Sequence, residues 1–203
     1  MITRFLVAAL LAAASAPALS QDAPALSPPA TELVPVAIDT SAGRIVVALD
    51  KTHAPVTTAN FLRYVDAHRF DGETFYRAMH VQGGEGGLIQ GGITTDARKL
   101  YPPIKHEPTS ETGLRNSAGA ISMANGGAGT ARADFFILAS DIPALDATTT
   151  DPGFAPFGHV IEGMDVVNRI LASPVSPTKG EGAMKGQMLD PTVKIIKAAR
   201  LKK

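Results

Sequence analysis

The sequence predicts a mostly β domain in which an antiparallel barrel is capped by helices. Short runs of β-branched and aromatic residues recur along the chain, and only two segments carry apolar residues at helical spacing. A parallel sheet would need a helix between successive strands, so an α/β fold is disfavoured. With 203 residues, 45% of them hydrophobic, the chain can bury one sizeable core, and we expect a single domain.

The first twenty residues have the composition of a secretory signal. Arg4 supplies a positive charge, residues 5–13 form an apolar run too short to span a bilayer, and residues 18–20 are small. We expect cleavage after Ser20 and a periplasmic or secreted protein, the alternative being a buried N-terminal helix. Residues 21–33 are rich in Pro, Ala and Ser and are expected to form a flexible spacer.

The domain is expected to occupy residues 34–198 and to begin with a hairpin. Two β-branched runs, 34–39 and 44–49, flank a turn that ends in Gly43. A helix is predicted within residues 52–67, because proline is tolerated in a first turn and the apolar residues that follow recur at helical spacing.

The rest of the domain alternates strands with polar, Gly-rich or Pro-rich loops. Further strands are predicted at residues 74–79, 88–92, 118–124, 135–138, 157–161 and 192–198. A second amphipathic helix is predicted at 164–171. The main loops are expected after Lys99, at 126–130 and at 140–156, and residues 199–203 form a basic tail.

Composition excludes several kinds of chemistry. The absence of cysteine rules out disulfides, thiolate nucleophiles and Cys-ligated zinc. Removing Arg4 with the signal leaves 18 Lys and Arg against 19 Asp and Glu, a balance that argues against a nucleic-acid partner. The five histidines are scattered, so no metal site is expected. The glycines of residues 83–87 lack the Gly-Lys-Ser/Thr that ends a phosphate-binding loop.

Short motifs follow one another in a distinctive order along the expected domain. They are Asn60-Phe61-Leu62, Phe75-Tyr76-Arg77, Leu88-Ile89-Gln90-Gly91-Gly92, Ser122-Met123-Ala124-Asn125, Phe135-Phe136-Ile137, Leu145-Asp146, Phe157-Gly158 and Glu162-Gly163-Met164. This order resembles the cyclophilin family of peptidyl-prolyl isomerases. The resemblance implies a closed eight-stranded antiparallel β-barrel capped by two α-helices, with no cofactor.

Arg77 carries a charge that pH does not remove, on a run that is otherwise mostly apolar. From spacing alone, it either faces an open groove or pairs with an acid such as Glu85 or Asp134. The resemblance implies the catalytic role. Rotation about an X-Pro bond has a barrier of ~18–20 kcal/mol and makes the prolyl nitrogen basic, so a donor aimed at that nitrogen stabilises the transition state.

The resemblance also implies a shallow apolar pocket for proline. Phe136 and Leu145 match pocket residues of the family, and Leu88 stands where methionine is usual. Without the family, Phe136 and Leu145 would be ordinary core residues. Gly87 occupies the position of an aromatic wall, which predicts a wider or weaker pocket.

Other positions are expected to hold the peptide. Gln90 matches the glutamine that positions the arginine and contacts substrate. Ala124, Asn125 and Gly126 match the segment whose main chain pairs with the residue before proline. Asn125 also fits an ordinary turn, since it precedes two glycines.

Further departures from the family surround the same groove. Asp134 replaces a glutamine and brings a carboxylate close to Arg77, where direct pairing would hold the arginine rigidly or partly neutralise it. Phe154 lies near the usual loop histidine and is expected to replace part of the missing wall. Residues 82–87 are expected to add a mobile flap.

We therefore expect an exported isomerase that acts on X-Pro bonds of exported or unfolded polypeptides and assists their folding. Its partners would be proline-containing peptides, with no nucleic acid, no stable membrane insertion and a monomeric state. The alternative is a proline-peptide-binding chaperone module with weak or no isomerase activity. A purely structural barrel would bind no peptide.

Overall fold

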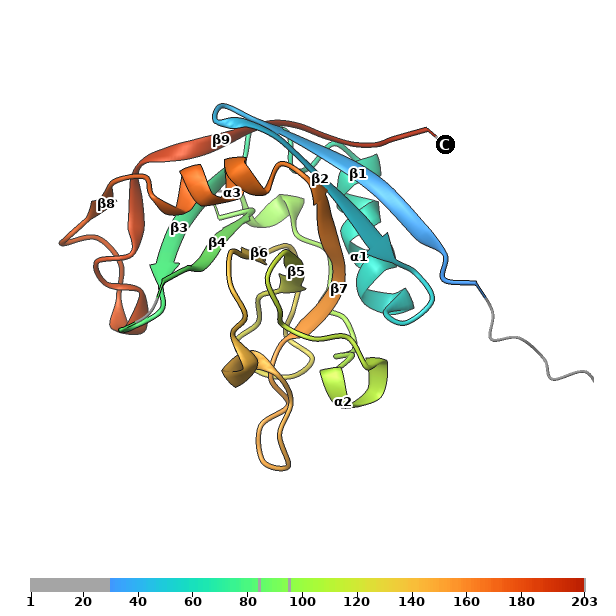
Figure 1. The fold of residues 1–203 in the computed structure, drawn as a ribbon. Helices are drawn as coiled ribbons and strands as arrows, with labels where there is room; N and C mark the ends of the chain where they lie inside the picture. The colour runs from blue at the N-terminus through green and yellow to red at the C-terminus, as the bar shows by residue number, and fades with distance from the viewer. Residues whose placement is uncertain (1–29, 84, 95, 203) are drawn as a thin grey trace, which may run out of the picture. The chain divides into compact units, whose positions relative to one another are not determined.

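The computed structural model describes residues 30–83, 85–94 and 96–202, and the described residues from Thr31 onward form one compact unit (Figure 1). The expected signal over residues 1–20 and residues 21–29 of the expected spacer lie outside the described residues, and Leu33, the last residue of the expected spacer, begins β1. In the part of the chain that is described, no helix is long and apolar enough to cross a membrane.

Eight strands close into an antiparallel barrel, which confirms the predicted fold class. Their order is β1-β2-β7-β5-β6-β4-β3-β9, and a further pairing between β1 and β9 closes the ring. The strands are β1 (Leu33–Thr40), β2 (Gly43–Asp50), β3 (Thr74–His80), β4 (Gly87–Gly92), β5 (Ala120–Met123), β6 (Phe135–Leu138), β7 (Ala155–Glu162) and β9 (Met188–Arg200).

Two helices cap the barrel at the predicted positions. α1 (Pro55–Asp66) packs on β2, β7 and β9, and α3 (Met164–Leu171) packs on β2, β3 and β4 (Figure 1). Both helices are amphipathic, and each buries its apolar face against strands. The spacing of apolar residues therefore predicted both helices correctly.

Some short elements and strand ends differ from the prediction. α2 (Thr109–Thr112) is a single turn within an expected loop, and β8 (Val175–Ser176) pairs only with β9, outside the barrel. β9 begins at Met188, earlier than predicted, because its first residues pair with β8 and with Arg77 of β3. Such pairings between distant segments leave no local signal in the sequence.

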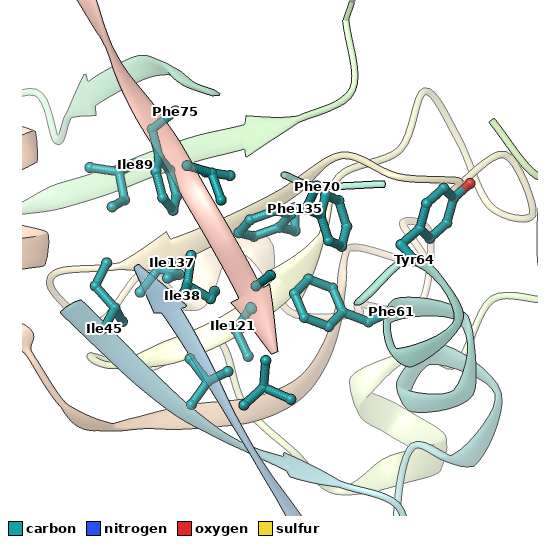
Figure 2. Close-up of a cluster of buried hydrophobic side chains, with 14 of the residues drawn as sticks. Ile38, Ile45, Phe61, Tyr64, Phe70, Phe75, Ile89, Ile121, Phe135 and Ile137 are labelled. Atoms are coloured by element: carbon teal, nitrogen blue, oxygen red, sulfur yellow. The ribbon is translucent and has the colours of Figure 1, made fainter. Parts of the chain in front are cut away.

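The barrel interior is filled by aromatic and branched side chains. Phe61 of α1 lies beside Phe70 and Phe135, with ring centroids 5.0 and 5.2 Å apart (Figure 2). The ring of Phe157 is 5.3 Å from that of Phe61. Phe75 of β3 joins this cluster through Phe135, at 5.6 Å. The core therefore fixes β3 and β6, and residues of these two strands contribute to the candidate site.

Candidate functional site

A β-bulge in β3 turns two consecutive side chains toward one cavity. The register of β3 shifts between Phe75 and Arg77 against both β4 and β9, so Tyr76 is the extra residue. Phe75 and Ala78 are buried in the core, whereas Tyr76, Arg77 and Met79 line the cavity. Strict alternation would place Tyr76 and Arg77 on opposite faces of the strand.

Two neutral amides hold the Arg77 guanidinium. Nη1 donates to Oε1 of Gln90 at 2.8 Å, while Nε and Nη2 both donate to Oε1 of Gln187, at 2.8 and 2.7 Å. A guanidinium has five N–H bonds. Three are used here, and the other two have no partner among the described residues. Burial lowers the pKa of Arg77, but the group stays charged at neutral pH.

A chain of hydrogen bonds continues from Gln90 to a buried acid. The Gln90 amide Nε2 donates to the Tyr76 hydroxyl at 2.7 Å, and that hydroxyl donates to Oδ1 of Asp134 at 3.1 Å. Burial raises the pKa of Tyr76, with the Asp134 charge adding to the effect, so the hydroxyl keeps its proton. The chain thus orients Gln90 with its oxygen toward Arg77.

Asp134 is itself strongly perturbed. Burial raises the pKa of this carboxyl to about 6, an effect that the hydrogen bond from Tyr76 opposes and the nearby charge of Glu73 increases. Gly92 allows the close packing, because a Cβ at this residue, whose φ is +149°, would lie 2.3 Å from Oδ1 of Asp134.

Arg77 does not pair with an acid, in contrast to the possibility left open by the sequence. Within the described ranges, none of the ion pairs includes Arg77, so the direct pairing considered with Asp134 or Glu85 is wrong for this structure. Tyr76 and Gln90 stand between the two charges and link them only indirectly.

All ten residues selected from the sequence line a single cavity of about 650 Å³. They are Arg77, Leu88, Gln90, Ala124, Asn125, Gly126, Asp134, Phe136, Leu145 and Phe154. These residues come from β3, β4, β6, the 3-10 helix Pro143–Leu145 and two loops. The barrel fold brings them together, and their individual roles stay predictions.

The apolar end of the cavity is a small cluster separate from the main core. Leu88, Phe136 and Leu138 are buried, and Leu145 and Phe154 pack against them. The rings of Phe136 and Phe154 meet edge to face, with centroids 5.3 Å apart. Phe154 therefore supplies an aromatic wall from the loop before β7.

A hydrogen-bond network fixes the loop that carries Leu145. The backbone N–H and the side-chain Nδ2 of Asn116 donate to Oδ1 of Asp146, at 2.8 and 2.9 Å. The same Nδ2 is within 3.1 Å of the Leu145 carbonyl oxygen, and Ser122 donates to Asn116 from the buried strand β5. Leu145 is thus placed by polar groups beneath the cavity.

Gly87 has a backbone role at the position of the expected missing wall, and the wider or weaker pocket stays a prediction. It pairs with His80 at the hairpin end of β4. A Cβ at Gly87 would lie 1.9 Å from the Met79 carbonyl oxygen, so this backbone leaves no room for an aromatic side chain. The expected flap is a hairpin connection in which Val81 N–H donates to Gly86 at 3.2 Å.

The segment expected to pair with the peptide follows β5. The Ala124 N–H donates to the Asp134 carbonyl oxygen at 2.9 Å, and Oδ1 of Asn125 accepts from the Gly127 N–H at 3.0 Å. Among the described residues, the buried Nδ2 of Asn125 has no partner. This arrangement is a turn, as the sequence allowed, and Asn125 lines the cavity within it.

Several cavity residues escaped the sequence reasoning. Tyr76 and Met79 belong to the segment of β3 that carries Arg77. Selecting both of them from the sequence would have required knowing that a β-bulge interrupts the alternation of side chains along this strand. The others come from distant segments: Thr94, Leu100, Thr130, Arg132, Met184 and, at the start of β9, Met188. Gln187, which binds Arg77, immediately precedes Met188 and lies 110 residues beyond Arg77 along the chain. No local pattern links it to Arg77.

The described residues contain no group of three or more His, Cys, Asp or Glu side chains that could hold a metal ion. The cavity itself offers the held guanidinium of Arg77, amide groups, the phenol of Tyr76, the carboxyl of Asp134 and an apolar pocket. Such a site can bind a peptide and donate hydrogen bonds to its backbone.

Comparisons with known proteins agree with this geometry. Residues 35–199 match the family described as cyclophilin type peptidyl-prolyl cis-trans isomerase/CLD. A peptidyl-prolyl cis-trans isomerase A from Dickeya dadantii is 39% identical over 139 residues, which cover 66% of this chain and 70% of that protein. A relative of the same activity name from Streptomyces antibioticus is 37% identical, covering 71% of this chain and 87% of its own.

Solved structures resemble the fold. A cyclophilin type peptidyl-prolyl cis-trans isomerase from Cryptosporidium parvum superposes with a TM-score of 0.68 at 21% identity, over 85% of this chain and 99% of the other. The same Cryptosporidium protein crystallised in the presence of the dipeptide Ala-Pro gives a TM-score of 0.66, over 83% of this chain and 99% of that chain.

Proposed function

Because this chain belongs to the cyclophilin-type peptidyl-prolyl cis-trans isomerase family, we propose that it rotates X-Pro bonds in the cavity around Arg77. The planar amide resists rotation with a barrier of ~18–20 kcal/mol, and a catalyst must favour the twisted form over both planar forms. In the twisted form the prolyl nitrogen is pyramidal and accepts a hydrogen bond.

Arg77 supplies a donor suited to that nitrogen. Its guanidinium is held by Gln90 and Gln187, carries no acid partner in the described part of the chain, and keeps two N–H bonds for a ligand. Donors fixed in advance and sheltered from water need little reorganisation during the reaction. This arrangement of Arg77 beside the apolar pocket is the observation that carries the proposal.

The proline ring fits the apolar end of the cavity. Phe136 and Phe154 form two faces, and Leu88 and Leu145 complete the walls. Burying the ring holds one side of the bond, while the peptide before it pairs with the main chain of residues 124–126, which line the same cavity. The two sides of the bond would thus be held separately.

The substrates we propose are exported or unfolded polypeptides, whose folding the enzyme assists as a monomer in the periplasm or outside the cell. The signal-like composition of residues 1–20 supports export. The neutral overall charge supports peptide rather than nucleic-acid partners. Expression of the full gene followed by fractionation and N-terminal sequencing tests export and cleavage after Ser20.

A protease-coupled assay on a proline tetrapeptide tests the activity. The wild type should accelerate cis-to-trans conversion, and Arg77→Ala should lower kcat/KM by about 10²–10³-fold, the loss typical of removing one transition-state donor. Arg44→Ala is the matched control, because it removes an exposed arginine of β2 that pairs with Asp39 of β1. A wild-type rate equal to the uncatalysed rate, with peptide still bound, would leave the chaperone alternative.

A further inference from the structure

We infer that Gln187 is a positioning residue for catalysis, because it fixes the Arg77 guanidinium from the side opposite Gln90. Its single oxygen Oε1 accepts from Nε at 2.8 Å and from Nη2 at 2.7 Å. These two N–H bonds form one edge of the planar guanidinium, and a shared acceptor sets the rotation of that plane. The inference rests on the proposed function and deepens it.

Gln187 is well placed to act as a fixed anchor. Its backbone carbonyl accepts from the Ala78 N–H at 2.9 Å, and its own N–H donates to the Met184 carbonyl at 3.1 Å. It immediately precedes β9, whose Met188 pairs with Arg77. The acceptor oxygen therefore belongs to a backbone that is hydrogen-bonded to β3 itself, right beside the residue it holds.

The acceptors that hold the Arg77 guanidinium come from both sides of β3. Gln90 belongs to β4, and Gln187 leads into β9, the two neighbours of β3 in the barrel. A long arginine side chain alone would sample many rotamers, whereas two fixed acceptors leave one orientation. The remaining two N–H bonds are then held in a fixed direction for a ligand.

Gln90 and Gln187 are both uncharged, and the absence of a negative charge on these acceptors matters for catalysis. A carboxylate in the place of Gln187 would hold the guanidinium equally well, but it would offset the positive charge that the transition state needs. An amide oxygen positions the group and leaves its charge intact. Gln187 thus positions Arg77 without neutralising its charge.

The test removes the acceptor while keeping the length of the side chain. Gln187→Met should lower kcat by about tenfold to a hundredfold, the loss expected from a misplaced catalytic group, with KM changed less than about twofold. Lys185→Met is the matched control, since Lys185 is exposed on the same loop. It should keep wild-type kcat and KM.

A double-mutant cycle separates positioning from a structural role. In an Arg77→Ala background, Gln187→Met should change kcat by less than about twofold, because the group it positions is gone. An equal loss in both backgrounds would overturn the inference, as would an unchanged kcat in Gln187→Met. A wild type without activity would instead refute the proposed function, so the two failures are distinguishable.

A spectroscopic readout tests the contact without activity. The Arg77 Nε–H signal in ¹⁵N NMR, assigned by its loss in Arg77→Lys, should be protected from solvent exchange in the wild type and in Gln187→Glu, which keeps an acceptor oxygen. It should broaden or vanish in Gln187→Met. An Nε–H signal that is unchanged in Gln187→Met would overturn the inference.

Discussion

The Tyr76 hydroxyl lies 3.1 Å from Oδ1 of Asp134 and donates to it. The same hydroxyl accepts from the amide of Gln90, the residue that holds Arg77. A buried acid is therefore connected to the candidate catalytic group through a phenol and an amide, without touching it. Because of this link, substitutions of Tyr76 and of Asp134 should have different, measurable effects on catalysis and on stability.

Replacing Tyr76 by Phe should weaken catalysis modestly. The Gln90 amide would lose its acceptor and could rotate away from Arg77, so kcat/KM should fall about 2–10-fold, the range of one hydrogen bond. Since the hydrogen bond from Tyr76 lowers the pKa of Asp134, that pKa should rise further in the variant, as followed by ¹³C NMR of the carboxyl. Tyr101→Phe, away from this hydrogen-bond chain, should change neither; equal effects in both variants would contradict the link.

Asp134→Asn should change how stability depends on pH. The pKa of Asp134 is raised in the folded state, from an ordinary 3.8 to about 6. The folded protein thus favours the protonated acid, and the wild type loses stability as pH rises from about 4 through 6. Asparagine keeps the acceptor for Tyr76 and has no charge to bury. The gain in unfolding free energy of the variant over wild type should therefore grow by about 2–3 kcal/mol between pH 4 and pH 8.

Urea unfolding at both pH values measures this difference. Asp165→Asn, which removes an exposed acid on α3, is the control and should follow the wild-type profile. If the difference in unfolding free energy between Asp134→Asn and the wild type is the same at pH 8 as at pH 4, the Asp134 carboxyl is not held in a desolvated site.

Phe154→Ala should weaken the proline pocket. The variant loses an edge-to-face contact with Phe136 and a large part of the apolar wall, so KM for a proline tetrapeptide should rise about tenfold while kcat changes little. Phe154→Leu, which keeps apolar bulk, should show a smaller rise. A kcat loss with unchanged KM would place Phe154 outside the binding pocket.

Gly87→Ala should destabilise the fold by about 3 kcal/mol or more, because its Cβ would lie 1.9 Å from the Met79 carbonyl oxygen at the hairpin of β3 and β4. Gly83→Ala is the matched control: that residue also has a positive φ, but nothing lies within 4 Å of an added Cβ. It should cost only about 1 kcal/mol. Chemical denaturation measures the unfolding free energy of both variants. Equal losses would mean that the backbone moves to relieve the contact between the added Cβ and the Met79 carbonyl oxygen.

The strands, helices and barrel class could be predicted because each depends on local residue patterns. Apolar spacing gave α1 and α3 near their observed bounds, and β-branched runs gave eight strands. The short elements α2 and β8 could not be predicted, since a single turn or a two-residue strand is stabilised by what it packs on.

The candidate site divides in the same way. Motifs on single strands identified Arg77, Gln90 and Phe136, and all of them line the cavity. The relation of Arg77 to Asp134 was left open, because spacing along the chain does not give the direction of a side chain. A bulge and two intervening side chains decided it.

The sequence by itself determined which residue types are available: a permanent cation, Arg77, within the mostly apolar run 74–79, two aromatic rings for a pocket, and no cysteine. Only the tertiary structure decided that Gln187, rather than an acid, accepts the second set of hydrogen bonds from the Arg77 guanidinium. The reason is physical. Barrel closure brings the start of β9 beside β3, and contacts across 110 residues depend on that closure rather than on any local pattern.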